Sequence, residues 1–174
     1  MRDDSRKWQP AQGLERDPVV MDGLTIRVIQ PERQALLSGP YASLLALANV
    51  TGTVGWPDPA MGDSYAIRLR RDRILAVNGP TLADGWHDEI GVAVSDMTWG
   101  YAVIELNGPA AMGVLQRGTE ITLDTPSASV ARRFAGHDAL IYARGPDSYR
   151  LHVLRPYLDA VWGLITSLGV DAVS

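Results

Sequence analysis

The stretch VAVSDMTWGYAVIELNGPAAMGVLQRGTEITLD, residues 92–124, decides the fold class of this chain. Apolar residues alternate from Tyr101 to Leu106, which predicts a strand with one buried face. The pattern then changes to helical spacing after Pro109. Proline suits the first position of a helix because the N–H that it lacks would have no partner there. The stretch therefore predicts a strand followed by a short helix.

The two ends of this helix carry residues that helix ends prefer. Asn107 or Gly108 can cap its start. Arg117 lies in the last turn, where a cation is favourable beside the helix dipole, and Gly118 can end the helix in a left-handed conformation. We therefore expect a tight entry and a glycine stop.

Similar patterns predict the other elements. The expected strands are residues 24–29, 65–70, 73–78, 90–95, 129–135, 139–144 and 149–154. The expected helices begin at Pro40, at Asn78-Gly79-Pro80, at Pro109 and at Pro156, and the last one ends at Gly169. Strands, hairpins and helices that alternate in this way indicate an α+β fold. We expect two ferredoxin-like β-α-β-β-α halves, mainly antiparallel sheet with helices on one face.

The chain divides into a tail and one domain. Residues 1–21 are polar and lack periodicity, so we expect a flexible tail that becomes ordered only against a partner. Residues 22–174 form the domain, with halves at about 22–89 and 90–170. The repeated Asn-Gly-Pro at 78–80 and 107–109 indicates helix entry and fold pseudo-symmetry rather than a shared site.

Composition narrows the function classes. The chain has 174 residues, 46% hydrophobic and 21% charged, as in an ordinary folded domain. A net charge of −4 argues against nucleic acid as a partner. The absence of cysteine excludes disulfides and thiolate chemistry, and no apolar run is long enough to span a bilayer. We expect a cytoplasmic protein.

No catalytic, cofactor-binding or metal-ligating residue is predicted. His87, His137 and His152 share no ligand spacing, and we expect solvent-facing or structural roles for His137 and His152. The cluster Trp86–Glu89 could in principle bind a metal ion, but adjacent residues do not easily point at one ion, so a surface loop is the better interpretation. No nucleophile elbow, Walker loop or dinucleotide-binding glycine motif occurs.

A partner surface is the remaining kind of site. The run Arg68–Arg73 is expected to be the solvent face of a hairpin or, alternatively, a surface for an acidic partner. Residues 51–64 read as a surface loop, in which an aromatic side chain among prolines could dock a partner. The candidate interface residues are Trp8, Trp56, Arg68, Arg70, Trp86 and Trp99.

Three short motifs and one longer segment resemble a known family. Asp96-Met97-Thr98, Asn107-Gly108-Pro109 and Arg117-Gly118-Thr119 match the order Asp-Leu-Ser, Ser-Gly-Pro and Lys-Gly-Cys of the folate-binding aminomethyltransferase superfamily, in particular of the gamma subunits of heterotetrameric sarcosine oxidases. Residues 149–169, YRLHVLRPYLDAVWGLITSLG, resemble the closing strand and helix of the family. Thr119 replaces the cysteine. The resemblance covers residues 92–168, with a looser match over 22–91.

The resemblance implies an aminomethyltransferase-like fold and a non-catalytic gamma-type subunit. The complex would oxidatively demethylate sarcosine to glycine, pass the one-carbon unit to tetrahydrofolate or release it as formaldehyde, and produce peroxide. FAD, FMN, NAD and tetrahydrofolate would lie on the partner subunits, named alpha, beta and delta. Asp96 matches a family position, and we expect its carboxylate to stabilise a turn by accepting backbone N–H groups.

Three alternatives remain open. One is a stand-alone folate-binding or one-carbon-transfer protein of the same superfamily. Another is a subunit of a related N-methyl amino acid demethylase, with dimethylglycine or N-methylproline in place of sarcosine. The third is an interaction domain of an unrelated complex.

Overall fold

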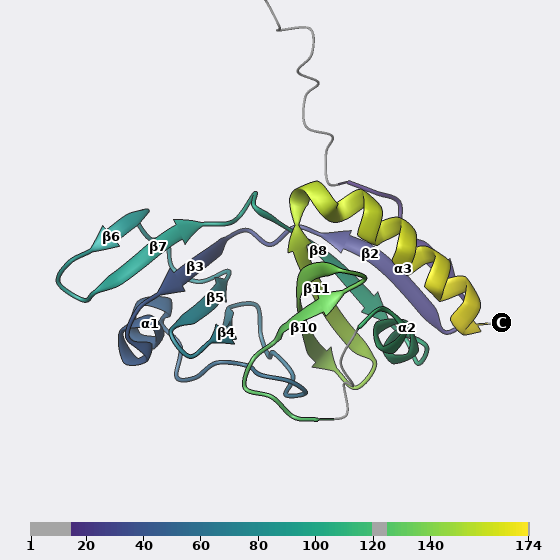
Figure 1. Cartoon of the computed structure of the whole chain (residues 1–174), viewed down its shortest axis with the longest axis horizontal. Coiled ribbons are helices and arrows are strands. Elements are labelled where there is room, and N and C mark those ends of the chain that lie inside the picture. The colour runs from purple at the N-terminus through teal and green to yellow at the C-terminus, as the bar shows by residue number, and fades with distance from the viewer. Residues whose placement is uncertain (1–14, 120–124, 174) are drawn as a thin grey trace, which may run out of the picture.

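Two antiparallel sheets face each other in the computed structural model, which describes residues 15–119 and 125–173 (Figure 1). The first sheet has the order β1-β2-β8-β11-β10-β9, with β1 Val19–Met21, β2 Leu24–Ile29, β8 Tyr101–Asn107, β9 Ala131–Phe134, β10 His137–Gly145 and β11 Ser148–Leu154. The second has the order β4-β5-β3-β7-β6, with β3 Gln34–Ser38, β4 Tyr65–Arg70, β5 Arg73–Val77, β6 Gly85–His87 and β7 Val92–Asp96. The helices are α1 Tyr41–Ala48, α2 Ala111–Gly118 and α3 Leu158–Val173, the last entered through a 3₁₀ turn at Arg155–Tyr157.

The buried apolar side chains form three clusters between four layers. One cluster lies between α2, α3 and the first sheet, another between the two sheets, and the third between the second sheet and α1. Alternation along β10 shows how this arises: Ile141 belongs to the helix-facing cluster and Tyr142 to the cluster between the sheets. The layer order is therefore helix, sheet, sheet, helix, and each sheet carries its helices on one face, in agreement with the expected α+β class.

Each sheet contains the same four-strand unit. The order β10-β11-β8-β2 in the first sheet corresponds to β4-β5-β3-β7 in the second, and a helix follows the third strand of each unit. Gly108 before α2 and Gly39 before α1 have φ values of 118° and 155°. A Cβ at Gly108 would collide with the carbonyl oxygen of Gly23, and one at Gly39 with that of Gly91. Gly23 and Gly91 directly precede β2 and β7, so these two close approaches are equivalent.

The structure corrects which Gly-Pro sequences are equivalent. Ser38-Gly39-Pro40 is the counterpart of Asn107-Gly108-Pro109, and Asn78-Gly79-Pro80 begins no helix. Asn78 has a positive φ of 51°, its N–H donates to the carbonyl of Arg33, and its side-chain oxygen accepts from the N–H of Arg33. These contacts hold the chain beside the start of β3, and it continues towards β6 without a helical turn.

Each sheet contains strands from both of the expected sequence halves. β2, from the first half, pairs with β8, and β7, from the second half, pairs with β3. The division near residue 90 therefore does not coincide with the division between the sheets, although both sheets repeat one topology.

The N-terminal boundary also differs from the expectation. Val19–Met21 forms β1 rather than the end of a tail, because the chain turns at Asp22-Gly23 and pairs Met21 with Leu24. A two-residue Asp-Gly turn between apolar segments is a strong hairpin signal. Residues 1–14, which include the candidate Trp8, lie outside the described residues.

The helix ends differ from the expected glycine stops. Gly118 is the last residue of α2, and a Cβ there would collide with the ring of Phe134. Ala110 is the N-cap of α2, and no side chain caps it. Gly169 lies within α3, where a Cβ would lie 2.9 Å from Leu24. Gly118 and Gly169 therefore allow close packing of a helix rather than end one.

The remaining strands and helices of the prediction are confirmed within a few residues, while β3 and β6 were not expected. Among the described residues, no helix has both the length and the apolar character needed to cross a membrane.

Candidate functional site

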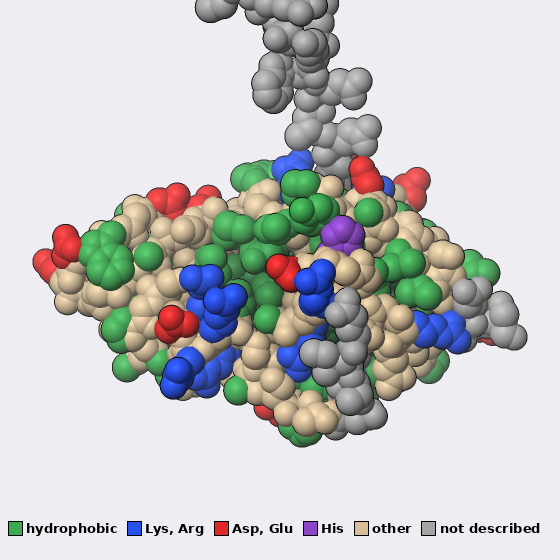
Figure 2. Space-filling model, viewed as in Figure 1, with side chains coloured by type: hydrophobic (Ala, Val, Ile, Leu, Met, Phe, Trp, Pro, Cys, Tyr) green, Lys and Arg blue, Asp and Glu red, His purple; other side chains and the backbone are tan. Residues whose placement is uncertain are grey.

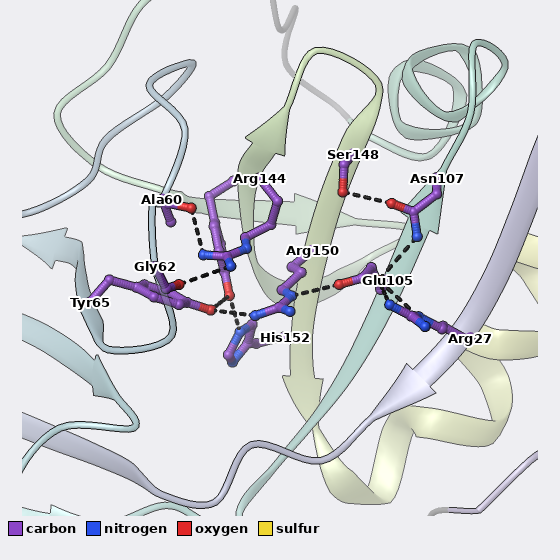
Figure 3. A network of polar contacts seen from close by, with 11 residues as sticks. Arg27, Ala60, Gly62, Tyr65, Glu105, Asn107, Arg144, Ser148, Arg150 and His152 are labelled. Atoms are coloured by element: carbon purple, nitrogen blue, oxygen red, sulfur yellow. Dashed lines mark hydrogen bonds and ion pairs between the residues drawn. The ribbon is translucent and has the colours of Figure 1, made fainter.

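A chain of polar side chains crosses the layer between the two sheets (Figure 3). His152 on β11 is fully buried, with Nδ1 2.8 Å from Gln34 Oε1 and Nε2 2.8 Å from the Tyr142 hydroxyl. The hydroxyls of Tyr142 and Tyr65 are 2.7 Å apart, and Arg150 Nη1 donates to Tyr65 at 2.8 Å. Because Gln34 and Tyr65 lie on the second sheet and the others on the first, this chain connects the sheets.

The Gln34 amide fixes the direction of the first hydrogen bond. Its Nε2 donates to the carbonyls of Thr98 and Tyr101, at 3.3 and 3.2 Å. Its Oε1 is therefore the acceptor, and His152 Nδ1 must carry the proton that it receives.

The other ring nitrogen of His152 accepts a hydrogen bond. Burial and, to a smaller extent, the nearby charge of Arg150 together lower the pKa of His152 to about 3. The ring is therefore neutral near pH 7, so Nε2 accepts from the Tyr142 hydroxyl. Tyr142 in turn accepts from Tyr65, and each donor in this series has an acceptor.

The other end of the network is ionic. Glu105, 5% exposed by side chain, lies on β8 directly opposite Arg27 on β2 and Arg150 on β11. Arg27 Nε donates to it at 2.8 Å, Arg150 Nε at 2.9 Å and Asn107 Nδ2 at 3.0 Å. Burial raises the pKa of Glu105, but the hydrogen bonds from Asn107, Arg27 and Arg150 outweigh it and hold the pKa below its usual value. The Glu105 carboxylate therefore stays charged, and both of its oxygens accept hydrogen bonds.

This network joins strands and offers no free acid or base. The other two histidines are also engaged: His87 Nε2 lies 2.9 Å from the carbonyl oxygen of Ala83, and the His137 ring lies 4.6 Å from that of Tyr157. In the part of the chain that the structure describes, no three His, Cys, Asp or Glu side chains gather as metal ligands would. The contacts of His152 thus agree with the structural role that was expected for it.

An apolar hollow of about 340 Å³ opens beside α2. Its lining residues include Trp56, Pro57, Met112, Pro146 and Tyr149. The Tyr149 hydroxyl donates to the carbonyl of Pro146 at 2.7 Å, and none of the described residues that line the hollow is charged. Such a surface could receive a flat ring or an apolar side chain but has no group to hold a charge.

A polar hollow of about 220 Å³ lies beside the paired strands β3 and β7 and is lined in part by Arg33, Asp84, Asp96 and Thr98. Asp96 Oδ1 accepts from the N–H of Thr98 at 2.8 Å, and Asp84 Oδ1 accepts from the N–H of Asp96 at 2.6 Å. Hydrogen bonds from the side chain and backbone of Thr98 lower the pKa of Asp96. The expected turn-stabilising role of Asp96 is confirmed.

A third hollow, of about 280 Å³, opens where the two sheets meet. We call it the seam groove and define it by Arg70, Arg73, Tyr101, Arg132, Asp138 and Leu154, which are among its lining residues. Figure 2 shows Lys and Arg side chains on both sides of a hydrophobic strip on this face of the molecule. The groove brings Arg70, a candidate interface residue, together with Arg73 of the same basic run and with Arg132, which the sequence alone did not single out.

The candidate tryptophans do not form one surface. Trp56 is 2% exposed and packs with Tyr149 at a ring distance of 6.0 Å, so it is a core residue and not a surface anchor in this chain. Trp86 is 62% exposed on β6, at the outer edge of the second sheet, whereas Trp99 is 63% exposed in the turn between β7 and β8 (Figure 1). Trp99 lies under the guanidinium of Arg155, 5.4 Å from the ring centre.

The two candidate arginines also differ in their surroundings. The Arg68 guanidinium lies 4.6 Å above the ring of Tyr41, so part of its surface is already covered. Arg70 is exposed and directed to the seam groove. Sequence reasoning missed the buried network, but one signal was present: Arg150 and His152 alternate with Leu151 and Val153, which places two polar side chains on one face of β11.

The fold is one already known among solved structures. A chain of the heterotetrameric sarcosine oxidase from Corynebacterium sp. U-96, in complex with pyrrole 2-carboxylate, is similar to this chain with a TM-score of 0.69 and 20% identity. The match covers 87% of this chain and 86% of that chain. No family model and no curated protein matches the sequence. The resemblance stated from the sequence is thus confirmed at the level of the fold.

Proposed function

We propose that this chain is the gamma-type subunit of a heterotetrameric, flavin-dependent sarcosine oxidase. The observation that carries this proposal is the extent of the structural match, 87% of this chain and 86% of the other. A match over nearly the full length of both is a match to a whole small chain of that heterotetramer, not to one domain of a large chain. The motifs at Asp96, Asn107 and Arg117 support the same assignment.

The proposed role of the chain is to support assembly of the complex rather than to catalyse. His152 and Glu105 are buried, and their polar atoms contact other side chains. A general base must instead reach the proton that it abstracts. The polar network supports a rigid body that a larger catalytic subunit can pack against.

The complex would oxidatively demethylate sarcosine to glycine, with transfer of the one-carbon unit to tetrahydrofolate or release of formaldehyde, and with formation of peroxide. In this proposal FAD, FMN, NAD and tetrahydrofolate lie on the alpha, beta and delta partners in the cytoplasm, and none on this chain. A related N-methyl amino acid could replace sarcosine, because the substrate contacts lie on another subunit.

One observation favours a second function, a stand-alone folate-binding protein. The lining of the hollow beside α2 is apolar and includes Met112 and Pro146, against which a pteridine ring could pack. Titration of the isolated chain with a reduced folate tests this function. Saturable binding that Met112→Trp weakens, by filling the hollow, would support it.

Native mass spectrometry with an absorbance spectrum tests the main proposal. The chain is tagged in its own host and purified under mild conditions. We expect a yellow complex that contains one copy each of larger flavin-bearing subunits. A colourless monomer would contradict the assignment. Full oxidase activity of an otherwise intact complex from which this chain has been removed would contradict the supporting role.

A further inference from the structure

The seam groove is formed by both sheets. Arg70 and Arg73 come from the β4–β5 hairpin of the second sheet, whereas Arg132 and Leu154 come from β9 and the end of β11 in the first. The hydrogen bond from Val130 N to the carbonyl of Arg68, at 2.8 Å, connects the two sheets beside it. A ligand in this groove therefore contacts both sheets at once.

The arginines of the seam groove have N–H donors beyond those used in their hydrogen bonds to the protein. Arg73 uses Nε to bond Ser38 Oγ at 3.0 Å, and Arg132 uses Nη1 to bond the carbonyls of Ser129 and Ala131 at 2.9 and 2.8 Å. Their other guanidinium N–H groups, and those of Arg70, form no ion pair with a carboxylate of the described residues. Burial lowers the pKa of Arg132, because removing water from the guanidinium makes its charged form less stable. An anion placed here would stabilise that charged form.

Apolar surface continues from the arginines. Leu154 is 38% exposed and lines the groove, and Tyr101 beside it is half-buried. Trp99 and Tyr157, which are close in sequence to Tyr101 and Leu154, are 63% and 43% exposed. Arginine and aromatic side chains are enriched at protein interfaces.

We propose that the seam groove receives an acidic segment of a larger partner subunit, with carboxylates on Arg70 and Arg132 and an apolar side chain on Leu154. This inference rests on the proposed function and deepens it. Charge complementarity carries the argument, because three arginines, Arg70, Arg73 and Arg132, line the groove with one carboxylate, Asp138, in a chain of net charge −4. A protein segment fits better than nucleic acid, since a protein segment can place an apolar side chain on Leu154 and a phosphate backbone cannot.

Charge reversal in the native complex tests the groove. The double variant Arg70→Glu/Arg132→Glu is compared with Arg71→Glu/Arg117→Glu, which makes the same change in net charge outside the groove. We expect the groove variant to bind the purified larger subunits at least about tenfold more weakly, and the control to bind like the unchanged chain. Thermal unfolding midpoints of both variants show whether each is folded.

A cross-link tests the contact without altering charge. Lys7 is the only lysine of the chain, so Arg132→Lys introduces a distinctive amine. A carbodiimide joins an amine to a carboxylate only where they touch. In the native complex we expect a cross-link from position 132 to an Asp or Glu of a larger subunit, and none from the control Arg117→Lys.

The outcomes separate the two proposals. If the unchanged chain purifies without larger subunits, the proposed function fails, and the groove inference with it. If the flavin-bearing complex forms but the groove variant binds as tightly as its control, and position 132 gives no cross-link, the groove inference alone is overturned. Cross-linking of position 132 to a second copy of this chain, or binding of nucleic acid that Arg70→Glu/Arg132→Glu abolishes, would also overturn it.

Discussion

The Tyr142 hydroxyl donates to His152 Nε2 over 2.8 Å in a layer between two sheets that is closed to solvent. Tyr142 and His152 lie on neighbouring strands of the first sheet, and each also forms a hydrogen bond to the second sheet, Tyr142 with Tyr65 and His152 with Gln34. In such a place a hydrogen bond matters mainly through the penalty of leaving a buried partner without one.

Tyr142→Phe is expected to destabilise the chain by about 1–3 kcal/mol, because it leaves His152 Nε2 without a donor and the Tyr65 hydroxyl without its acceptor. The free energy of unfolding in urea measures this. Tyr157→Phe is the matched control, since Tyr157 is 43% exposed and should change stability by less than about 0.5 kcal/mol. Equal effects of the two substitutions would contradict the role of the buried hydroxyl.

His152 should make the fold sensitive to mild acid. Its pKa is lowered from 6.5 to about 3 by burial and by Arg150, so the unfolded state binds the proton and the folded state does not. Stability is therefore fully present above about pH 6.5 and falls with pH towards about 3, by about 1.4 kcal/mol per pH unit within that window. The facing groups, Gln34, Tyr142, Tyr101 and Arg150, supply no acid that titrates there.

The measurement is urea unfolding at about pH 7 and about pH 5, where the expected loss is about 2 kcal/mol. His152→Gln keeps an amide able to bond Tyr142 and Gln34 but cannot take a proton, so its stability should change less over the same interval. A loss that is the same in both proteins would assign the pH dependence to other groups.

Glu105→Gln is expected to cost about 3 kcal/mol, because it removes the charge that Arg150 and Arg27 share at a site 5% exposed. Arg27→Met should cost less than about 1 kcal/mol, since the Arg27 side chain is 52% exposed. Because the pKa of Glu105 is lowered in the folded state, its contribution is present above about pH 4.5 and is lost below it. Urea unfolding of both variants at about pH 7 checks the order, and a larger cost for Arg27→Met would contradict it.

Much of the fold could be predicted from local pattern, and the buried site could not. β11 alternates apolar and polar residues and β8 is a mostly apolar run, and both patterns predict a strand from sequence alone. β3 was missed because Gln34 begins it with a polar side chain that is 1% exposed. The partners that make this burial possible, Thr98 and His152, are distant in sequence. A buried polar group can be recognised only after the strands that hold its partners have been paired.

The glycines show a second limit. A glycine near the end of a helix reads as a left-handed stop, yet Gly118 and Gly169 are helical residues that permit close packing against Phe134 and Leu24. A glycine in the local sequence shows where the backbone can adopt a left-handed conformation. Whether another side chain packs closely against that glycine depends on the tertiary structure.

Two glycines of α2 should therefore respond in opposite directions to the same change. Gly118→Ala places a Cβ against the Phe134 ring and should destabilise by about 1–3 kcal/mol. Gly113→Ala meets nothing within 4 Å and should stabilise by about 0.5–1 kcal/mol, because alanine restricts the unfolded chain and favours the helix.

The cause can be isolated with Phe134→Leu, which removes the ring that Gly118 contacts. In the Gly118→Ala background this second change should cost less than it does alone, since it relieves the overlap as well as leaving space. Urea unfolding of the single and double variants gives the coupling energy. Additive effects would mean that overlap with the Phe134 ring is not the cause of the destabilisation by Gly118→Ala.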